Sequence, residues 1–171
     1  MLIEAKDLIN LPVGAEDAQS KVGLIQKIII NPENGQLLGF LVITGFFSPP
    51  KALSFMDVKF WDKEGLVTAE EDNLVLPTEI VRLNHVLKAD INLIDMPAED
   101  ENGQSLGLVE NFLIDTETGS VVKYYLRDIL GNARILPSEK VIKIEKKIVF
   151  ASDVTQVSGF RLEVEGSQIE T

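Results

Sequence analysis

Two stretches of the chain show the same succession of apolar strand, polar turn and apolar strand. The first is KVGLIQKIIINPENGQLLGFLV at residues 21–42, and the second is SLGLVENFLIDTETGSVVKYYL at residues 105–126. Their flanks are rich in β-branched and aromatic residues, which favour a pleated strand over a helix. Each stretch therefore predicts a β-hairpin, and corresponding positions lie 84 residues apart.

The polar centres of these stretches, NPENG and DTETG, predict tight turns. Asn31 and Asp115 can accept hydrogen bonds from the turn backbone. Gly35 and Gly119 suit the positive φ of a turn that is closed by a glycine bulge. Because turn chemistry accounts for every residue, we interpret both segments as turns rather than as ion or phosphate sites.

A second pair of similar stretches follows, residues 54–68 against residues 136–150, each with a strand, a charged turn and a strand. The spacing has fallen from 84 to 82 residues, so we expect the preceding loop, which contains FFSPP at 46–50, to be two residues longer in the first copy. A period near 84 is too long for a solenoid repeat of about 20–50 residues. It predicts two copies of one small domain.

Each copy contains five or six short strand patterns and no long amphipathic helix, which is typical of a small barrel or sandwich. The predicted fold is therefore all-β, with two tandem small antiparallel barrels or sandwiches. Closure into β-barrels is physically attractive, because it removes the exposed strand edges that invite aggregation. Ile80, Leu83 and Leu87 fit one helical face, so we expect a short helix or a turn, together with an edge strand, to join the two copies. The predicted boundaries are 1–78 for the first domain, 79–94 for the linker, 95–155 for the second domain, and 156–171 for a C-terminal strand and tail.

The charge balance argues against two classes of partner. The chain has 27 acidic and 16 basic residues, for a net charge of −11. Nucleic acids and anionic membranes both attract clustered Lys and Arg, so we expect no direct nucleic-acid binding. The longest apolar stretch, residues 37–47, is well short of the ~20 residues that span a bilayer, so no membrane insertion is expected. The absence of cysteine favours, without proving, a reducing interior.

The order of these motifs resembles the PRC-barrel family. This family is named for the photosynthetic reaction centre H subunit, and it includes the C-terminal domain of the RimM-type ribosome maturation factors. The resemblance implies a small β-barrel of about six strands per copy. It implies docking on a protein partner or complex and supplies no shared catalytic residues. One departure is Lys123, which stands in the second copy where the first has Gly39.

Residues that would carry catalysis or hold a metal are scarce. His85 is the single histidine, and nothing beside it suggests a catalytic triad. The acidic clusters at 69–72 and 98–101 lack the ligand spacing of a calcium-binding loop. The glycine spacing in GLIQKIIINPENG, residues 23–35, matches neither the Walker nor the Rossmann phosphate-binding loop. We therefore expect no enzyme activity, no cofactor and no metal.

The aromatic residues supply the candidate partner-binding site. The loop TGFFSPPK carries Phe46 and Phe47, and we add Trp61, Tyr125 and Arg127 as further candidates. Phe, Trp, Tyr and Arg are enriched in protein–protein interfaces. The alternative interpretation places the aromatics at the barrel ends or in the seam between the two copies.

Three functions follow as hypotheses. The first is a non-enzymatic scaffold that docks on a partner protein, with the soluble face of a photosynthetic or other membrane complex as one setting. The second is a ribosome-assembly factor that docks on a ribosomal protein. The third is a small-ligand binder or enzyme that uses a groove between the barrels. The expected location is cytoplasmic, either free or peripheral to a membrane complex. The sequence leaves open whether the chain forms a homo-oligomer.

Overall fold

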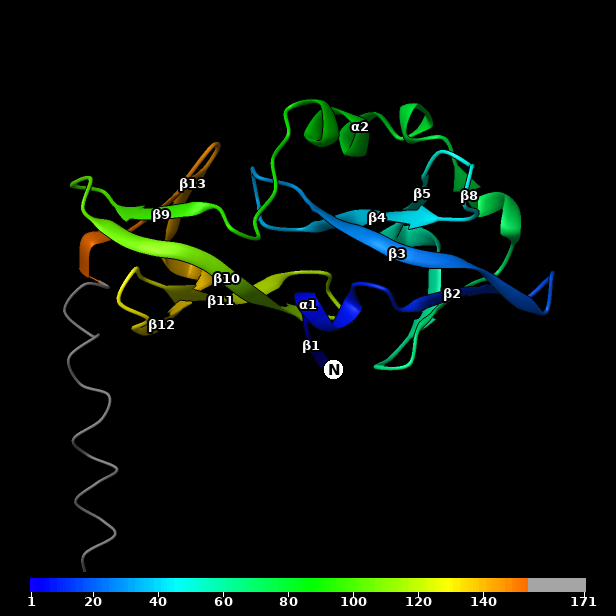
Figure 1. Ribbon diagram of the computed structural model, residues 1–171, viewed down its shortest axis with the longest axis horizontal. Coiled ribbons are helices and arrows are strands. Elements are labelled where there is room, and N and C mark those ends of the chain that lie inside the picture. The colour runs from blue at the N-terminus through cyan, green and yellow to red at the C-terminus, as the bar shows by residue number, and fades with distance from the viewer. Residues whose placement is uncertain (154–171) are drawn as a thin grey trace, which may run out of the picture.

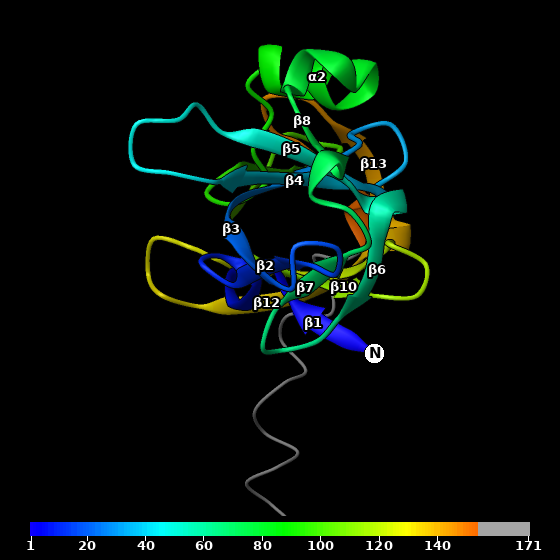
Figure 2. The same cartoon turned by 90° about the vertical axis from the view of Figure 1, so that its right-hand side faces the viewer.

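The computed structural model describes residues 1–153, which form two curled β-sheets arranged end to end along the long axis (Figure 1). Each sheet contains seven strands. Viewed along the long axis, the first sheet wraps around an apolar interior, as expected for a barrel-like unit (Figure 2). The predicted C-terminal strand and tail at 156–171 lie outside the described residues. The proposed domain boundaries stay a prediction.

The first unit follows the predicted order of hairpins. Its sheet has the strand order β6-β7-β2-β3-β4-β5-β8, and every pairing is antiparallel except β2 with β7. The strands are β2 (Pro12–Ala15), β3 (Ser20–Ile30), β4 (Leu37–Ile43), β5 (Lys51–Ser54), β6 (Val58–Trp61), β7 (Leu66–Thr68) and β8 (Leu74–Val75). The short 3-10 helices η1 (Phe55–Asp57), η2 (Glu71–Asn73) and η3 (Pro77–Glu79) join or follow them.

The second unit repeats this plan. Its order is β12-β11-β10-β9-β14-β13, and again one pairing is parallel, here β14 with β9. The strands are β9 (Pro97–Asp100), β10 (Ser105–Asp115), β11 (Val121–Arg127), β12 (Ala133–Pro137), β13 (Val141–Ile144) and β14 (Ile148–Phe150), with the 3-10 helix η4 (Ser138–Lys140) before β13. The prediction of two tandem all-β barrel-like units is confirmed. Each sheet also contains one parallel pair, which the prediction of antiparallel units did not include.

The two hairpin turns have the predicted geometry. The side chain of Asn31 accepts a hydrogen bond from the backbone of Glu33, and Asp115 accepts the equivalent bond from Glu117. Gly35 and Gly119 have φ angles of 69° and 72°, a backbone region that glycine adopts without strain. Both polar segments are therefore structural turns.

The extra residues of the first copy are divided between two places. The expectation that both lie in the loop before β5 is wrong. Phe40 pairs with Leu53 and Tyr124 pairs with Leu136, so only one extra residue lies in the β4–β5 loop. The second lies in the β6–β7 turn, which spans four residues, 62–65, against three, 145–147, between β13 and β14. A short hairpin turn absorbs one residue without changing the register of its strands.

The two units meet through equivalent residues of the repeat. Gln36 forms a β-bridge with Ser120, its counterpart 84 residues later, and their side chains are hydrogen-bonded at 2.7 Å. The backbone N–H of Leu37 donates to Gly119 at 2.8 Å, and the N–H of Val121 donates to Gly35 at 3.1 Å. These two bonds exchange equivalent partners, which is the pattern of a twofold-symmetric interface. The repeat is thus an internal pseudo-dimer.

The segment that precedes each unit in the chain packs against the other unit. β1 (Leu2–Glu4) pairs with β10 of the second unit, and α1 (Ala5–Leu8) follows at the junction. The linker helix α2 (Val81–Lys88) instead covers the first unit, where Leu83 and Val86 pack on its buried residues. The helical interpretation of the linker is confirmed, but the expected edge strand is absent, since residues 89–94 form no strand. Each unit is therefore covered by a segment that precedes the opposite unit.

One apolar core runs through both units. Its buried members include Phe40 and Leu66 of the first unit and Phe112 and Phe150 of the second. The buried Ile3 of β1 belongs to the same cluster. Burial of such large apolar side chains is the main driving force for folding. The two units therefore share a continuous interior.

Candidate docking surface

Four of the most exposed large apolar side chains stand on two loops that the repeat makes equivalent. Phe46 and Phe47 of the β4–β5 loop are 93% and 95% exposed. Ile129 and Leu130 of the β11–β12 loop are 100% and 81% exposed. We call these residues the apolar tips and their segments, 44–50 and 128–132, the tip loops. Fully exposed side chains of this size mark a candidate interaction site when they gather on one face.

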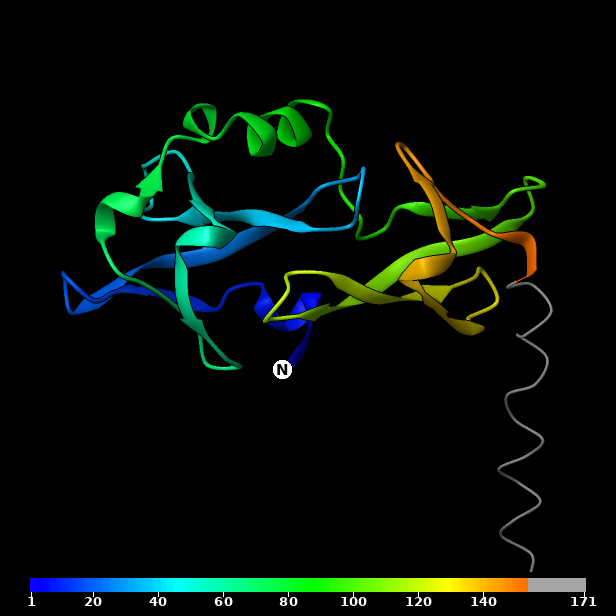
Figure 3. The same cartoon turned by 180° about the vertical axis from the view of Figure 1, so that it is seen from behind.

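The two tip loops project from the same side of the molecule. In Figure 2 both point to the left, one from each unit, while the β3–β4 and β10–β11 turns lie on the right. Figure 3 shows those turns from behind, near the centre of the opposite face. The internal symmetry explains this arrangement, because a pseudo-twofold relates the loops as it relates the turns. Figure 1 shows that the two loops lie toward opposite ends of this face, so a partner that contacts both tips has to extend along the long axis.

The hairpins that carry the tip loops are poor in acidic residues. Residues 34–56 contain no Asp or Glu and one basic residue, Lys51. Residues 118–138 contain one acidic residue, Asp128, and three basic residues, for a net charge of +2. These segments contrast with a chain whose net charge is −11. The exposed apolar groups thus lie in segments without net negative charge, where a carboxylate-bearing partner meets little repulsion.

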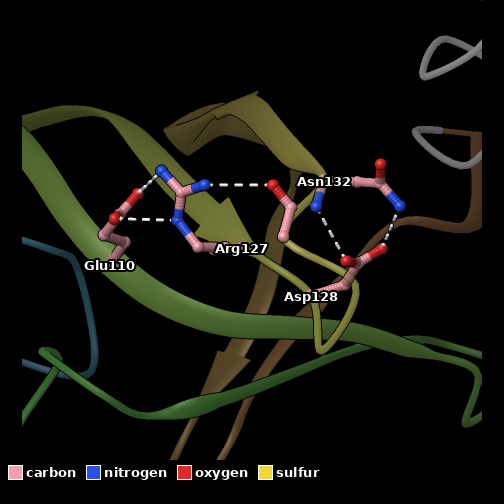
Figure 4. Close-up of polar contacts among 5 residues, drawn as sticks. Glu110, Arg127, Asp128 and Asn132 are labelled. Carbon is pink, nitrogen blue, oxygen red and sulfur yellow. Dashed lines mark hydrogen bonds and ion pairs between the residues drawn. The ribbon is translucent and has the colours of Figure 1, made fainter.

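A network of hydrogen bonds holds the β11–β12 loop in shape (Figure 4). The carboxylate of Asp128 accepts bonds from the backbone N–H groups of Leu130 and Asn132, both at 2.9 Å, and from the Asn132 side chain at 3.0 Å. The hydrogen bonds from Asn132 hold the pKa of Asp128 below its ordinary value. The apolar tip of this loop is therefore presented on a preformed scaffold, which reduces the entropy lost on binding.

Arg127 stands at the base of the same loop and braces it. Its guanidinium forms two hydrogen bonds with the carboxylate of Glu110, at 2.9 and 3.0 Å, and donates a third to the carbonyl of Gly131 at 3.0 Å. The bond from Arg127 lowers the pKa of Glu110. Arg127 is exposed, but its donors are used within the chain, so its main effect is to position the loop.

The β4–β5 loop is shaped by different contacts. Its two phenylalanine rings pack edge to face, with centroids 4.9 Å apart. The N–H of Ser48 donates to the carbonyl of Gly45 at 3.4 Å, and Pro49 and Pro50 restrict the backbone that follows. Phe46 and Phe47 therefore form one compact aromatic tip.

Two of the predicted residues have other surroundings. Trp61 is only 9% exposed, lies against Phe40 and Phe55, and donates its indole N–H to the carbonyl of Thr116 at 3.2 Å. It belongs to the seam between the units and is not presented to a partner, because the second unit covers it. Tyr125 is half-buried on β11, with the ammonium of Lys123 5.6 Å from its ring centroid.

Sequence reasoning missed Ile129 and Leu130. A signal was present, since the spacing of 84 places Ile129 opposite Gly45 and Leu130 opposite Phe46. Attention to aromatic residues alone hid it, because the second copy has Leu130 opposite Phe46 and Gly131 opposite Phe47. Exposure, rather than residue type, identifies the pair.

The comparison with protein families agrees with this geometry. A model of the PRC-barrel domain matches the chain twice, over residues 1–74 and 88–156. The chain belongs to the PRC-barrel family. The first match covers β1 and nearly all of the first sheet, and the second match covers the other strands of the second sheet, so this is a tandem PRC-barrel protein. A search of curated proteins found no match.

Family membership bears on function at a general level. PRC-barrel domains are generally protein-interaction modules. Within residues 1–153 of this tandem PRC-barrel protein, neither α-helix has the length and apolar character needed to cross a membrane. Over the same residues, no group of three or more His, Asp or Glu side chains is arranged to hold a metal ion. His85 is an exposed residue of α2.

Proposed function

We propose that this tandem PRC-barrel protein is a non-enzymatic docking protein that binds a partner protein through its two tip loops. The observation that carries the proposal is the pair of exposed apolar tips on one face, one from each unit. Large apolar side chains held on preformed loops are suited to act as binding hot spots, because little order is lost when they enter pockets.

The proposed partner is a protein that offers two apolar pockets with carboxylates nearby. The tip-loop hairpins carry net charges of +1 and +2, which complement acidic groups at the rim of such pockets. A lipid bilayer is the competing partner for exposed apolar tips. The overall charge of −11 opposes an anionic leaflet, and this favours a protein. A cytoplasmic setting, including the soluble face of a membrane complex, belongs to the same proposal.

The test compares matched variants in partner capture. We would immobilise the full chain, capture binders from its host lysate, identify them by mass spectrometry and then measure binding of the purified partner. Phe46→Ser with Phe47→Ser removes one tip, and Ile129→Ser with Leu130→Ser removes the other. Each double variant should weaken binding by roughly 30-fold, the size of a hot-spot loss, with the thermal unfolding midpoint nearly unchanged.

The control is Met56→Ser with Val81→Ser, which removes two other exposed apolar side chains, 85% and 79% exposed, outside the tip loops. It should bind the partner like the original chain. Equal binding by all variants would overturn the proposal. Sedimentation with phosphatidylcholine vesicles that depends on the tips would replace the protein partner with a bilayer. A large loss of stability in the Phe46 and Phe47 variant would show that these residues are structural.

A further inference from the structure

A pocket lies at the seam, on the pseudo-twofold between the two units. Three pairs of repeat-equivalent residues line it, each pair 84 residues apart: Ile9 and Leu93, Asn10 and Ile94, and Ile28 and Phe112. Its volume is about 460 Å³. Small-molecule pockets commonly measure about 300–1,000 Å³, so the space is sufficient for a compact ligand. The pocket is separate from the tip loops, none of whose residues line it.

The pocket combines an apolar floor with a polar rim. Phe112 and Leu93 are buried beneath it, and Ile28 and Ile94 are half-buried at its wall. Ile9, which is 37% exposed, extends the apolar surface to solvent. Such a surface favours the hydrocarbon part of a ligand, because its contact with water is removed on binding.

The charge of the rim is the feature that selects a ligand. Lys6 and Lys27 line the pocket, and no Asp or Glu is among its lining residues, although acidic residues outnumber basic ones by 27 to 16 in the chain. The ion pairs found within residues 1–153 involve neither lysine. The positive charge of Lys6 helps to lower the pKa of Glu110, but both oxygens of the Glu110 carboxylate accept hydrogen bonds from Arg127.

We propose that this pocket binds a small amphiphilic carboxylate, such as a medium-chain fatty acid, with its head group at Lys6 and Lys27 and its chain on Ile28 and Phe112. Two lysines that line a largely apolar pocket match such a ligand in both charge and polarity. The site depends on both units, since the floor and rim combine residues of α1, β3, β10 and the segment 92–94. The proposal is independent of partner docking at the tip loops.

The experiment is a titration of the isotope-labelled full chain with sodium decanoate, followed through its amide NMR signals. Saturable shifts are expected at residues 5–10, 26–28 and 92–94. Lys6→Gln with Lys27→Gln should weaken binding about tenfold or more, because charge-assisted contacts are lost. Replacing both lysines with Arg should retain binding. Decanol, which has the same chain without the charge, should bind at least about tenfold more weakly than decanoate.

The matched control is Lys63→Gln with Lys146→Gln, which makes the same change in net charge at exposed positions outside the pocket. It should leave decanoate affinity within about twofold, since exposed charges at a distance are screened. The Phe46 and Phe47 variant should also bind decanoate normally, which separates this site from the docking function. Absence of saturable shifts, shifts confined to the tip loops, or equal binding of decanol and decanoate would each overturn the proposal.

Discussion

At the scale of single residues, Asp128 determines how one apolar tip is presented. Its carboxylate accepts three hydrogen bonds. Arg127 links the same loop to the neighbouring strand, because it donates both to the carbonyl of Gly131 and to the carboxylate of Glu110. Neither carboxylate is buried, so solvent screens these contacts and their effect on global stability is small. Their effect is local, because they hold the backbone of residues 128–132 in one conformation.

Acid should loosen this loop. The pKa values of Glu110 and Asp128 are lowered from ordinary values of 4.5 and 3.8, so their contribution is present at neutral pH and is lost as pH falls through the lowered values. Backbone relaxation at residues 129–132 should therefore increase only once the pH falls below 3.8, the ordinary value for Asp128. NMR relaxation measured between pH 7 and pH 2.5 would check this.

Asp128→Ala supplies the matching observation at neutral pH. It should give the same loosening at residues 129–132 without acid, because the acceptor of all three bonds is removed. The β4–β5 loop, which has no such carboxylate, should keep its relaxation rates in both experiments. Loosening of both loops together at low pH would instead indicate general acid unfolding.

At the scale of elements, Gly39 allows β5 and the helix α2 to pack closely against β4 in the first unit. A Cβ atom at this position would overlap the carbonyl oxygen of Leu53 and lie 3.1 Å from a methyl group of Leu83 on α2. The close approach of β4, β5 and α2 therefore requires glycine in the first unit. The second unit has Lys123 at the equivalent position, and the segment paired with its long strand is β1 rather than a helix.

Gly39→Ala should lower the free energy of unfolding by about 1–3 kcal/mol, the usual cost of overpacking. Chemical denaturation measures this change. Lys123→Ala is the control at the equivalent position, where the half-exposed side chain already has a Cβ and the change should be within about 0.5 kcal/mol. A neutral Gly39→Ala would mean that β5 or α2 shifts to make room.

At the scale of the whole molecule, the two units are joined more closely than two tandem domains usually are. β1 belongs to the second sheet, α2 covers the first, and one core cluster includes residues of both. The reciprocal bonds at Gly35 and Gly119 add a direct backbone connection. When two units share a core, and each is packed against a segment that precedes the other, the unfolding of either unit removes contacts from both.

We therefore expect thermal unfolding in a single transition, with equal calorimetric and van't Hoff enthalpies. Ile3→Ala tests this coupling, because Ile3 is 2% exposed and reaches the second unit from the first residues of the chain. The variant should lower stability by about 2–4 kcal/mol and keep one transition. Trp61 fluorescence, which reports on the seam, should change together with the circular dichroism signal. Two separate transitions would show that the units fold independently.

The sequence by itself determined the elements and their repetition. Turn residues such as Asn31 and Gly35 act through local backbone chemistry, and alternating apolar residues define strands, so both hairpins, their spacing and the family resemblance could be predicted. The short linker helix followed from local periodicity in the same way. The exposure of Phe46 and Phe47 also agrees with a loop defined by its Gly, Ser and Pro content.

Only the tertiary structure decided how the two copies meet. The burial of Trp61, the pairing of β1 with β10 and the bridge between Gln36 and Ser120 all join residues more than 50 positions apart. No local pattern encodes such contacts, because they depend on how two curled sheets pack about a pseudo-twofold. The same packing brings the apolar tips onto one face and Lys6 and Lys27 into one pocket, which is why the candidate sites appear only in the folded chain.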